Sequence, residues 1–216
     1  MLEKMDAFFE ARLAGYDAHM LRDIEGARDF YPLTASLLPK SHKAHILDLG
    51  CGTGLELEYF YSANPSACVT GIDLSEAMLR ALKAKFPEKD LTLIRGSYFE
   101  VPLGSAVFDA AVSVESLRHF TQAEKTALYA KLCASLKSGG YFILTDYFAL
   151  DDADEAHWFQ ELKRLKKEQG ITGGEFYHYD TPLTVAHETE ALLAAGFTAV
   201  EVANRWGATC CLKATK

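Results

Sequence analysis

The sequence predicts a doubly wound α/β fold, in which helices cover both faces of a mostly parallel sheet. From Ala44 onward, short apolar runs alternate with helix-like stretches over about a hundred residues. The apolar runs are nearly continuous, as expected for strands that are buried on both faces. Alternating glycines follow the first run, where a strand-to-helix turn of such a sheet would lie. With 216 residues, 49% of them hydrophobic, the chain suits one domain.

The N-terminal 40 residues predict helices that precede the sheet. Apolar residues recur at steps of three and four from Met5 to Ile24, which indicates one face of a helix. A second short helix is expected from Ala27 to Leu38, where Pro39 ends it.

Five apolar runs predict the parallel strands: AHILDLG, CVTGID, LTLIRG, FDAAVSV and YFILTDYF. Between the second and third runs, SEAMLRALKAKF predicts a helix with Ser75 as its N-cap. After the fourth, TQAEKTALYAKLCASLKSGG predicts a helix with Thr121 and Glu124 in capping-box spacing and Gly139 as its end. The buried stripe of that helix is expected to consist of Leu128, Leu132 and Leu136.

The last part of the chain predicts a different arrangement. A helix in TVAHETEALLAAG precedes FTAVEVANRW and ATCCLKATK, which are separated by a turn near Gly207 and read as an antiparallel hairpin at the end of a seven-stranded mixed sheet. We therefore expect a single domain over residues 1–216. Its parts are a helical segment (1–40), a ligand-binding core (41–150), an insertion (151–180) and a C-terminal helix and hairpin (181–216).

Composition narrows the class of protein. The formal charge of −8 argues against a nucleic-acid backbone as the main partner. Five cysteines without CxxC spacing suggest free thiols in a reducing compartment. No apolar run approaches the roughly 20 residues of a membrane helix, and the N-terminal residues do not resemble a signal peptide. We expect a cytoplasmic protein without a membrane partner.

Metal sites are not predicted by the spacing of the possible ligands. The seven histidines show neither HExxH nor HxxxH spacing. Cys210 and Cys211 are adjacent on a predicted strand, so their thiols should point to opposite faces of the sheet.

The first predicted turn carries the clearest signal for a ligand. Gly50, Gly52 and Gly54 would let a ligand approach bare main chain. No GK[ST] follows, which excludes a P-loop, and Leu55 stands where a dinucleotide fingerprint needs its last glycine. Asp73, at the end of the second strand, could accept hydrogen bonds from two ribose hydroxyls. With Asp48 also near the turn, a cationic nucleoside fits better than a diphosphate.

The segments ILDLGCGTG, GIDLSEAML, IRGSYFEVPL, FDAAVSVESLRHF and LKSGGYFILTD, in this order and spacing, resemble class I S-adenosylmethionine-dependent methyltransferases. The resemblance covers residues 44–150 well and 181–216 more loosely. It implies that S-adenosylmethionine is the cofactor, that S-adenosylhomocysteine is the product, and that residues 1–40 form a lid. It also implies that residues 151–180 lie on the substrate side.

The resemblance further implies which positions bind the cofactor. They are Asp48, Gly50, Cys51, Gly52, Gly54, Asp73, Leu74, Met78, Ser97, Tyr98 and Ser113. The glycine turn would hold the methionine and ribose portions, and Asp48 would orient the turn and the ligand's ammonium. Ser113 would lie beneath the methionine portion, whereas Cys51 could equally be a filler of the turn.

The remaining positions concern the ribose and the adenine. Asp73 would bind the ribose hydroxyls. Leu74 and Met78 would flank the adenine, although Met78 also suits a purely core position. Ser97 and Tyr98 would bound the adenine edge. Ser97 stands where the family often has an acidic residue, and Ser138 stands where it usually has proline.

The predicted reaction is in-line transfer of a methyl group to a small-molecule acceptor, for which positioning supplies much of the acceleration. No catalytic residue is determined. Glu115, His119 and Tyr147 are candidates for a base, with a solvated loop carboxylate, a helix-capping histidine and a core tyrosine as the structural alternatives. Tyr16 and Tyr31 could reach the cofactor, and Phe176 to Tyr179 could wall the acceptor.

Other functions remain open at this stage. They are aminopropyl transfer on the same fold, a nucleotide-binding module without turnover, a dehydrogenase, and methylation of an RNA or protein. The residues specify neither the acceptor atom nor the oligomeric state.

Overall fold

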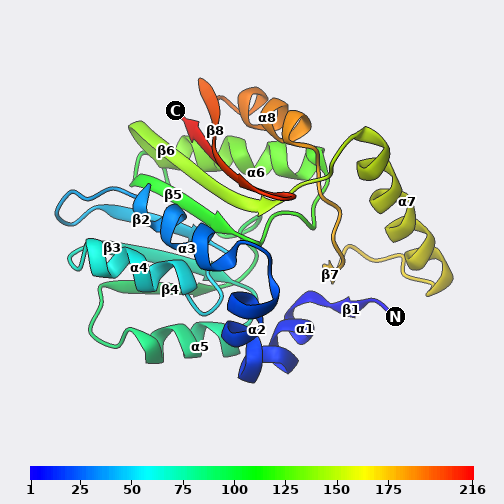
Figure 1. The fold of residues 1–216 in the computed structure, drawn as a ribbon, viewed down its shortest axis with the longest axis horizontal. Helices are drawn as coiled ribbons and strands as arrows, with labels where there is room; N and C mark the ends of the chain where they lie inside the picture. Colours follow the sequence, from blue (N-terminus) through cyan, green and yellow to red (C-terminus); the bar gives the residue numbers. More distant parts are fainter.

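The computed structural model describes residues 1–216. Seven strands form one sheet in the order β4-β3-β2-β5-β6-β9-β8 (Figure 1). The strands are β2 (His45–Leu49), β3 (Cys68–Asp73), β4 (Leu91–Arg95), β5 (Phe108–Val114), β6 (Leu136–Tyr147), β8 (Ala199–Trp206) and β9 (Thr209–Thr215). The first five in chain order run parallel, and β9 is antiparallel to β6 and to β8. This confirms the predicted fold class, including the C-terminal hairpin.

Helices form a layer on each side of the sheet. On one face lie α3 (Ala27–Ser36), α4 (Leu55–Ala63) and α5 (Glu76–Lys85), and on the other α6 (Gln122–Ser135) and α8 (Val185–Ala194). Neighbouring strand residues alternate between the two cores, as the period of a strand requires. Cys210 belongs to the α6–α8 core and Cys211 to the α3–α5 core, so the prediction that their thiols diverge is confirmed.

The N-terminal segment differs from the single predicted helix face. It consists of β1 (Glu3–Lys4), α1 (Met5–Arg12), a 3₁₀ turn (Leu13–Gly15) and α2 (Tyr16–Asp23). Gly15 is the N-cap of α2, and glycine is a poor residue for a helix interior. Strand β1 pairs antiparallel with β7 (Tyr177–His178). The start of the chain therefore lies beside the segment that follows α7 (Figure 1). Two-residue strands carry no periodic signal, which is why the sequence did not predict this pair.

The boundary between α6 and β6 also corrects a prediction. The helix ends at Ser135, and Leu136 is buried as the first residue of β6, paired with Phe108. Gly139 has a φ of 74° inside the β6 segment, so its left-handed conformation serves a bend in that strand and not the end of the helix. The capping predictions are confirmed. Ser75 accepts a hydrogen bond from Met78 N, and Thr121 and Glu124 form a reciprocal capping box.

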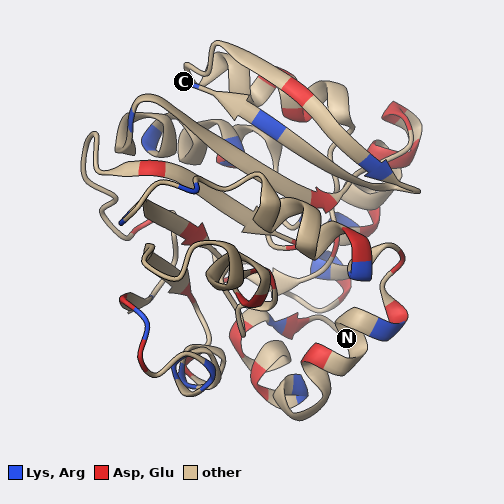
Figure 2. Cartoon of the chain, turned by 60° about the vertical axis from the view of Figure 1, so that its left-hand side comes forward, with Lys and Arg blue, Asp and Glu red and all other residues tan.

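Helix α7 (Asp152–Glu168) extends away from the sheet after β6 (Figure 1) and has no buried residue. Lysines and arginines are scattered among acidic residues in the view of Figure 2, without a continuous basic strip. None of the helices combines the length and apolarity that a membrane crossing requires.

Candidate active site

The glycine turn follows β2, which lies beside β5 where the strand order reverses. Gly50, Gly52 and Gly54 have φ values of 73°, 46° and 70°. A Cβ on Gly50 would lie 2.0 Å from Ser116 Oγ, and one on Gly54 would lie 2.4 Å from a leucine methyl of α5. A Cβ on Gly52 would meet nothing nearer than Tyr16, at 4.0 Å. Packing therefore excludes side chains at Gly50 and Gly54, whereas Gly52 presents bare main chain to open space.

Asp73 is the last residue of β3, the strand paired with β2, and its carboxylate contacts the glycine turn. One carboxylate oxygen accepts a hydrogen bond from Gly52 N at 2.9 Å, and the other accepts one from Ser75 N at 2.8 Å. Burial raises the pKa of this carboxyl, while these backbone donors oppose the rise. The turn and the carboxylate are therefore held together before any ligand arrives.

A narrow cavity lies between the turn and the N-terminal helices. Its lining residues are Met5, Phe9, Tyr16, Gly50, Gly52, Asp73, Met78, Val114, Glu115, Ser116 and His119. Its volume of about 40 Å³ is far below the roughly 300–1,000 Å³ of sites for small-molecule ligands. Because Met5, Phe9 and Tyr16 come from α1 and the start of α2, the N-terminal segment is closed over the site in this structure.

Asp48 and Glu56 form a pair of buried carboxyl groups under the turn. Their side chains come from β2 and the first turn of α4, and Asp48 Oδ2 and Glu56 Oε1 have no hydrogen-bond partner in the protein. Burial raises the pKa of both groups, and the pKa of Asp48 also rises because Glu56 is adjacent. Glu56 lines a second small cavity with Tyr31 and Gly50 to Leu55. No sequence pattern singles out Glu56, because it is embedded in the apolar helix start LELEYF.

Arg118 joins three carboxylates at the ends of β5, β6 and β7. Its Nη1 lies 2.8 Å from Glu115 Oε2 and 3.2 Å from Asp146 Oδ1, and its Nε lies 2.9 Å from Asp180 Oδ1. Burial raises the pKa of Glu115 to about 7, with Arg118 acting in the opposite direction and Asp146 and Asp180 in the same direction as burial. Glu115 also has a φ of 55°, which is uncommon for a residue with a Cβ and often marks a functional position.

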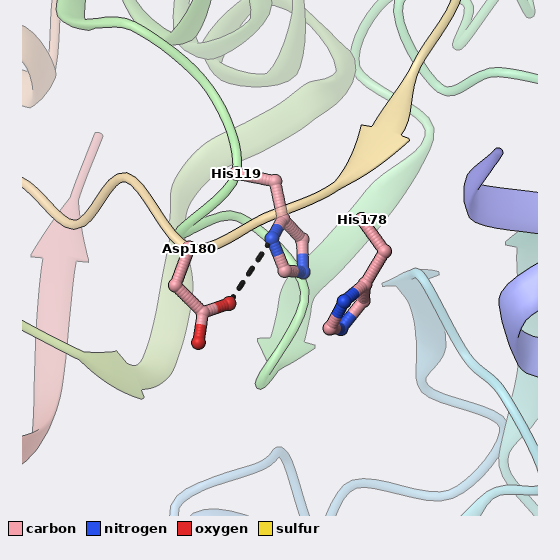
Figure 3. Close-up of side chains that lie close together, drawn as sticks. All are labelled: His119, His178 and Asp180. Carbon is pink, nitrogen blue, oxygen red and sulfur yellow. Dashed lines mark ion pairs between the residues drawn. The ribbon is translucent and has the colours of Figure 1, made fainter. Parts of the chain in front are cut away.

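His119 lies beside this network, close to His178 and Asp180 (Figure 3). Its Nδ1 is 3.0 Å from the Tyr179 carbonyl oxygen and 3.2 Å from Asp180 Oδ1. Both of these atoms are acceptors, so Nδ1 carries the proton and Nε2 has a free lone pair. Burial, reinforced by the charge of Arg118, lowers the pKa of His119 to about 3, so the ring is neutral.

His119, His178 and Asp180 are residue types that bind metals, and one possible ligand atom from each lies within 4.8 Å of the others. Spacing along the sequence could not reveal this group, because His119 precedes His178 and Asp180 by about 60 residues in the sequence. The protein itself already uses His119 Nδ1, and Asp180 Oδ1 is shared with Arg118. His178 stacks on Phe8 of α1 with 3.5 Å between the ring centres.

The other predicted residues divide into two groups. Met78 lines the cavity between the turn and the N-terminal helices, and Cys51 lines the second cavity and packs beneath Gly71. Leu74, Ser97, Tyr98, Ser113 and Tyr147 line neither of the two. Of these, Tyr98 contacts Ser116 through its hydroxyl, and Ser113 donates a hydrogen bond to the Leu49 carbonyl at 2.8 Å. Tyr31 lines the second cavity, as proposed for a residue that could reach the cofactor.

Comparison with known proteins agrees with this geometry. Residues 46–140 match the family model described as methyltransferase domain. The carboxy-S-adenosyl-L-methionine synthase of Wolinella succinogenes is 31% identical over 225 residues, which cover 92% of this chain and 88% of that protein. In fold, a candidate O-methyltransferase of Nostoc punctiforme superposes with a TM-score of 0.71 at 19% identity, covering 99% of this chain and 62% of that one. Human N-acetylserotonin methyltransferase, solved with S-adenosylmethionine, has a TM-score of 0.63 at 17% identity, covering 88% and 52%.

The glycine turn at the point where strand order reverses, the facing carboxylate and these similarities define a cofactor-dependent group-transfer enzyme. The chain belongs to the class I S-adenosylmethionine-dependent methyltransferases, and S-adenosylmethionine is its cofactor.

Proposed function

We propose that this enzyme methylates a small-molecule acceptor in the cavity under its N-terminal helices. The observation that carries the proposal is the composition of that cavity. It combines Gly52 and Asp73 on the cofactor side with Glu115 and His119 beyond β5, and residues of α1 form its roof. A roofed cavity admits a small molecule more readily than a polymer strand. The interspersed acidic and basic residues in Figure 2 and the net charge of −8 also fit poorly with a nucleic-acid substrate.

In this proposal the cofactor lies along the carboxyl ends of β2, β3 and β5. The bare main chain of the glycine turn holds its methionine and ribose portions, and Asp73 accepts hydrogen bonds from the ribose hydroxyls. Met78 packs on the adenine, and the Asp48–Glu56 pair lies on the side of the turn suited to the methionine ammonium. The residues proposed to form the site are Asp48, Gly50, Cys51, Gly52, Gly54, Glu56, Asp73, Leu74, Met78, Ser97, Tyr98 and Ser113.

When bound, S-adenosylmethionine supplies a methyl group that is already activated by its positive sulfur. The protein then has to align the acceptor with the carbon–sulfur bond and exclude water, and such positioning can lower a barrier by several kcal/mol. Met5, Phe9 and Tyr16 provide the apolar cover for this. We also place the enzyme in the cytoplasm, because all five cysteines are free and four of them are buried.

Relatives named carboxy-S-adenosyl-L-methionine synthase suggest a second candidate, which is formation of that carboxylated cofactor. A carboxylate partner would need a cation in the site. No lysine or arginine lines either cavity, and the charged lining groups are carboxylates. Methyl transfer therefore fits this chain better than a reaction that brings a carboxylate into the cavity.

Titration calorimetry with S-adenosylmethionine and S-adenosylhomocysteine tests the cofactor site. We expect Asp73→Ala to weaken S-adenosylhomocysteine binding by roughly 1.5–3 kcal/mol, because the ribose hydroxyls lose a charged acceptor. Asp29→Ala, an exposed aspartate of α3, is the matched control and should bind normally. Unchanged affinity in Asp73→Ala, or tighter binding of NAD(H) than of S-adenosylhomocysteine, would show that the site is assigned wrongly. Mass spectrometry of turnover products then distinguishes a methylated acceptor from a carboxylated cofactor.

A further inference from the structure

Two buried acceptor atoms of the cavity lack a donor within the protein. They are Glu115 Oε1 and His119 Nε2, and both residues line the same space as Gly52 and Asp73. The side chains of Glu115 and His119 are 5% and 1% exposed. Leaving such atoms without a partner is costly, so a molecule that occupies this space gains by donating hydrogen bonds to them.

The second atom of each group is already fixed by the protein. Glu115 Oε2 accepts a hydrogen bond from Arg118 at 2.8 Å, which leaves Oε1 directed elsewhere. The proton on His119 Nδ1 is committed to Tyr179 and Asp180, which leaves a lone pair on Nε2. His119 Nε2 stays an acceptor because Nδ1 holds the proton of the neutral ring, and Glu115 Oε1 is an acceptor whenever the carboxyl group is ionised. A ligand that meets the ionised form therefore has to bring at least two N–H or O–H donors.

The charges around the cavity select among such ligands. Its lining includes the carboxylates of Asp73 and Glu115 but neither lysine nor arginine. The nearby Arg118 is shared among Glu115, Asp146 and Asp180, so the buried cluster carries more carboxylates than cations. Glu115 Oε1 and His119 Nε2 would offer no donor to an anionic acceptor, whereas an ammonium group would complete the charge balance.

We infer that the methyl acceptor is an amine, which binds as its ammonium form with hydrogen bonds to Glu115 Oε1 and His119 Nε2. This inference rests on the proposed function and specifies its substrate class.

Methyl transfer to the amine starts with a proton transfer. Glu115 Oε1 takes one proton from the ammonium, which frees the nitrogen lone pair. That lone pair forms the new N–CH₃ bond while the carbon–sulfur bond breaks, and the electrons of the broken bond stay on sulfur. The product leaves as a methylated ammonium together with a neutral thioether, and the proton on Glu115 passes to solvent.

Ligand binding to the complex with S-adenosylhomocysteine tests the inference without turnover. The probes are matched sets built on one carbon skeleton, such as phenethylamine, 2-phenylethanol and phenylacetate, each titrated by calorimetry into wild-type protein. We expect the amines to bind at least roughly tenfold more tightly than the alcohols and carboxylates of the same skeleton. Equal or tighter binding of the alcohols or carboxylates, or no binding of any amine across the panel, would overturn the inference.

The variant Glu115→Gln identifies the residue responsible. We expect it to weaken amine binding at least about tenfold while the Kd of S-adenosylhomocysteine stays within roughly twofold. Glu190→Gln, an exposed glutamate of α8, is the matched control. If Glu115→Gln instead weakens S-adenosylhomocysteine binding, Glu115 serves the cofactor's own ammonium and the inference fails.

The comparison of ligand classes uses wild-type protein, so it decides the question even if the variant unfolds. If the wild-type protein does not bind S-adenosylhomocysteine at all, the result contradicts the proposed function itself.

Discussion

At Gly52 the bare main chain lines the cavity that we propose as the cofactor site. Its φ of 46° disfavours any residue with a Cβ, and only Tyr16 approaches the place where that Cβ would be. Gly139 has a similar backbone, with a φ of 74°, and open space around it, but it lies at the start of β6. The two glycines therefore share a backbone requirement and differ in their distance from the site.

This pair separates backbone strain from ligand contact. We expect Gly52→Ala and Gly139→Ala to lower the free energy of unfolding by a similar amount, about 1–2 kcal/mol, because each forces alanine into a left-handed conformation. Only Gly52→Ala should also weaken S-adenosylhomocysteine binding. Chemical denaturation and calorimetry measure the two effects, and equal binding by both variants would remove Gly52 from the ligand surface.

Glu115 makes the stability of the enzyme depend on pH. Its pKa is about 7 in the folded protein and has an ordinary value near 4.5. Between these values the folded state binds more protons than the unfolded state, so this residue's contribution to stability is greatest below about pH 4.5 and is lost as the pH rises toward 7. The charged and titratable groups around it are Arg118 and His119 on its loop, Asp146 on β6, Asp180 after β7 and Tyr16 on α2.

We expect Glu115→Gln to remove this dependence. The free energy of unfolding of the variant, relative to wild type, should rise by roughly 1–3 kcal/mol between pH 4.5 and 7 and change little above that range. Urea titrations at several pH values measure the difference. A constant difference across the range would show that Glu115 has an unperturbed pKa in the folded protein.

At the scale of elements, the N-terminal segment is only lightly attached. Helices α1 and α2 each bury a single residue, Met5 and Met20. The segment is further held by the two-residue pairing of β1 with β7 and by the stacking of Phe8 on His178. Few buried contacts mean a low free energy of local opening, which suits the lid that we propose over a cavity of about 40 Å³.

Hydrogen exchange tests this mobility. We expect the amides of Met5 to Asp23 to exchange faster than those of β2 and β5 in the free enzyme, and to slow at least roughly tenfold with S-adenosylhomocysteine bound. Helix α7 is also peripheral and provides the internal control, because its exchange should not change. Equal protection of residues 5–23 with and without the ligand would show that they are not a lid.

For the whole molecule, one buried ion pair ties α6 to α8 behind the sheet. Lys125 Nζ lies 2.6 Å from Glu188 Oε2, with both side chains at most 3% exposed, and Tyr129 donates a hydrogen bond to the same carboxylate. A buried pair adds little relative to an apolar substitute, yet removal of one partner leaves a charge without compensation.

We expect Lys125→Met to lower the free energy of unfolding of the whole domain by about 3–5 kcal/mol, because Glu188 loses its counter-charge. Adding Glu188→Gln should restore part of the loss, since glutamine is neutral and still accepts from Tyr129. Denaturation of both variants measures this. If the double variant is no more stable than Lys125→Met alone, the uncompensated charge of Glu188 is not the cause of the lower stability.

The sequence alone determined the elements whose patterns are local. The apolar runs located the five parallel strands, and the capping signals located the starts of α5 and α6, whereas the assignment of the cofactor to the glycine turn and Asp73 stays a prediction. The strand and capping predictions succeeded because hydrophobic periodicity and caps act within a few residues along the chain. The predicted end of α6 at Gly139 was wrong because pairing of Leu136 with Phe108, a distant contact, outweighed the local signal.

Only the tertiary structure brought Glu115 and Arg118 together with Asp146 and Asp180, placed Glu56 beside Asp48, and left His119 Nε2 buried without a partner. These side chains come from loops and strand ends that are far apart in the sequence, and no periodic pattern links them. Their pKa values and unpaired atoms follow from shared burial, which exists only after the strands have aligned their carboxyl ends at one edge of the sheet.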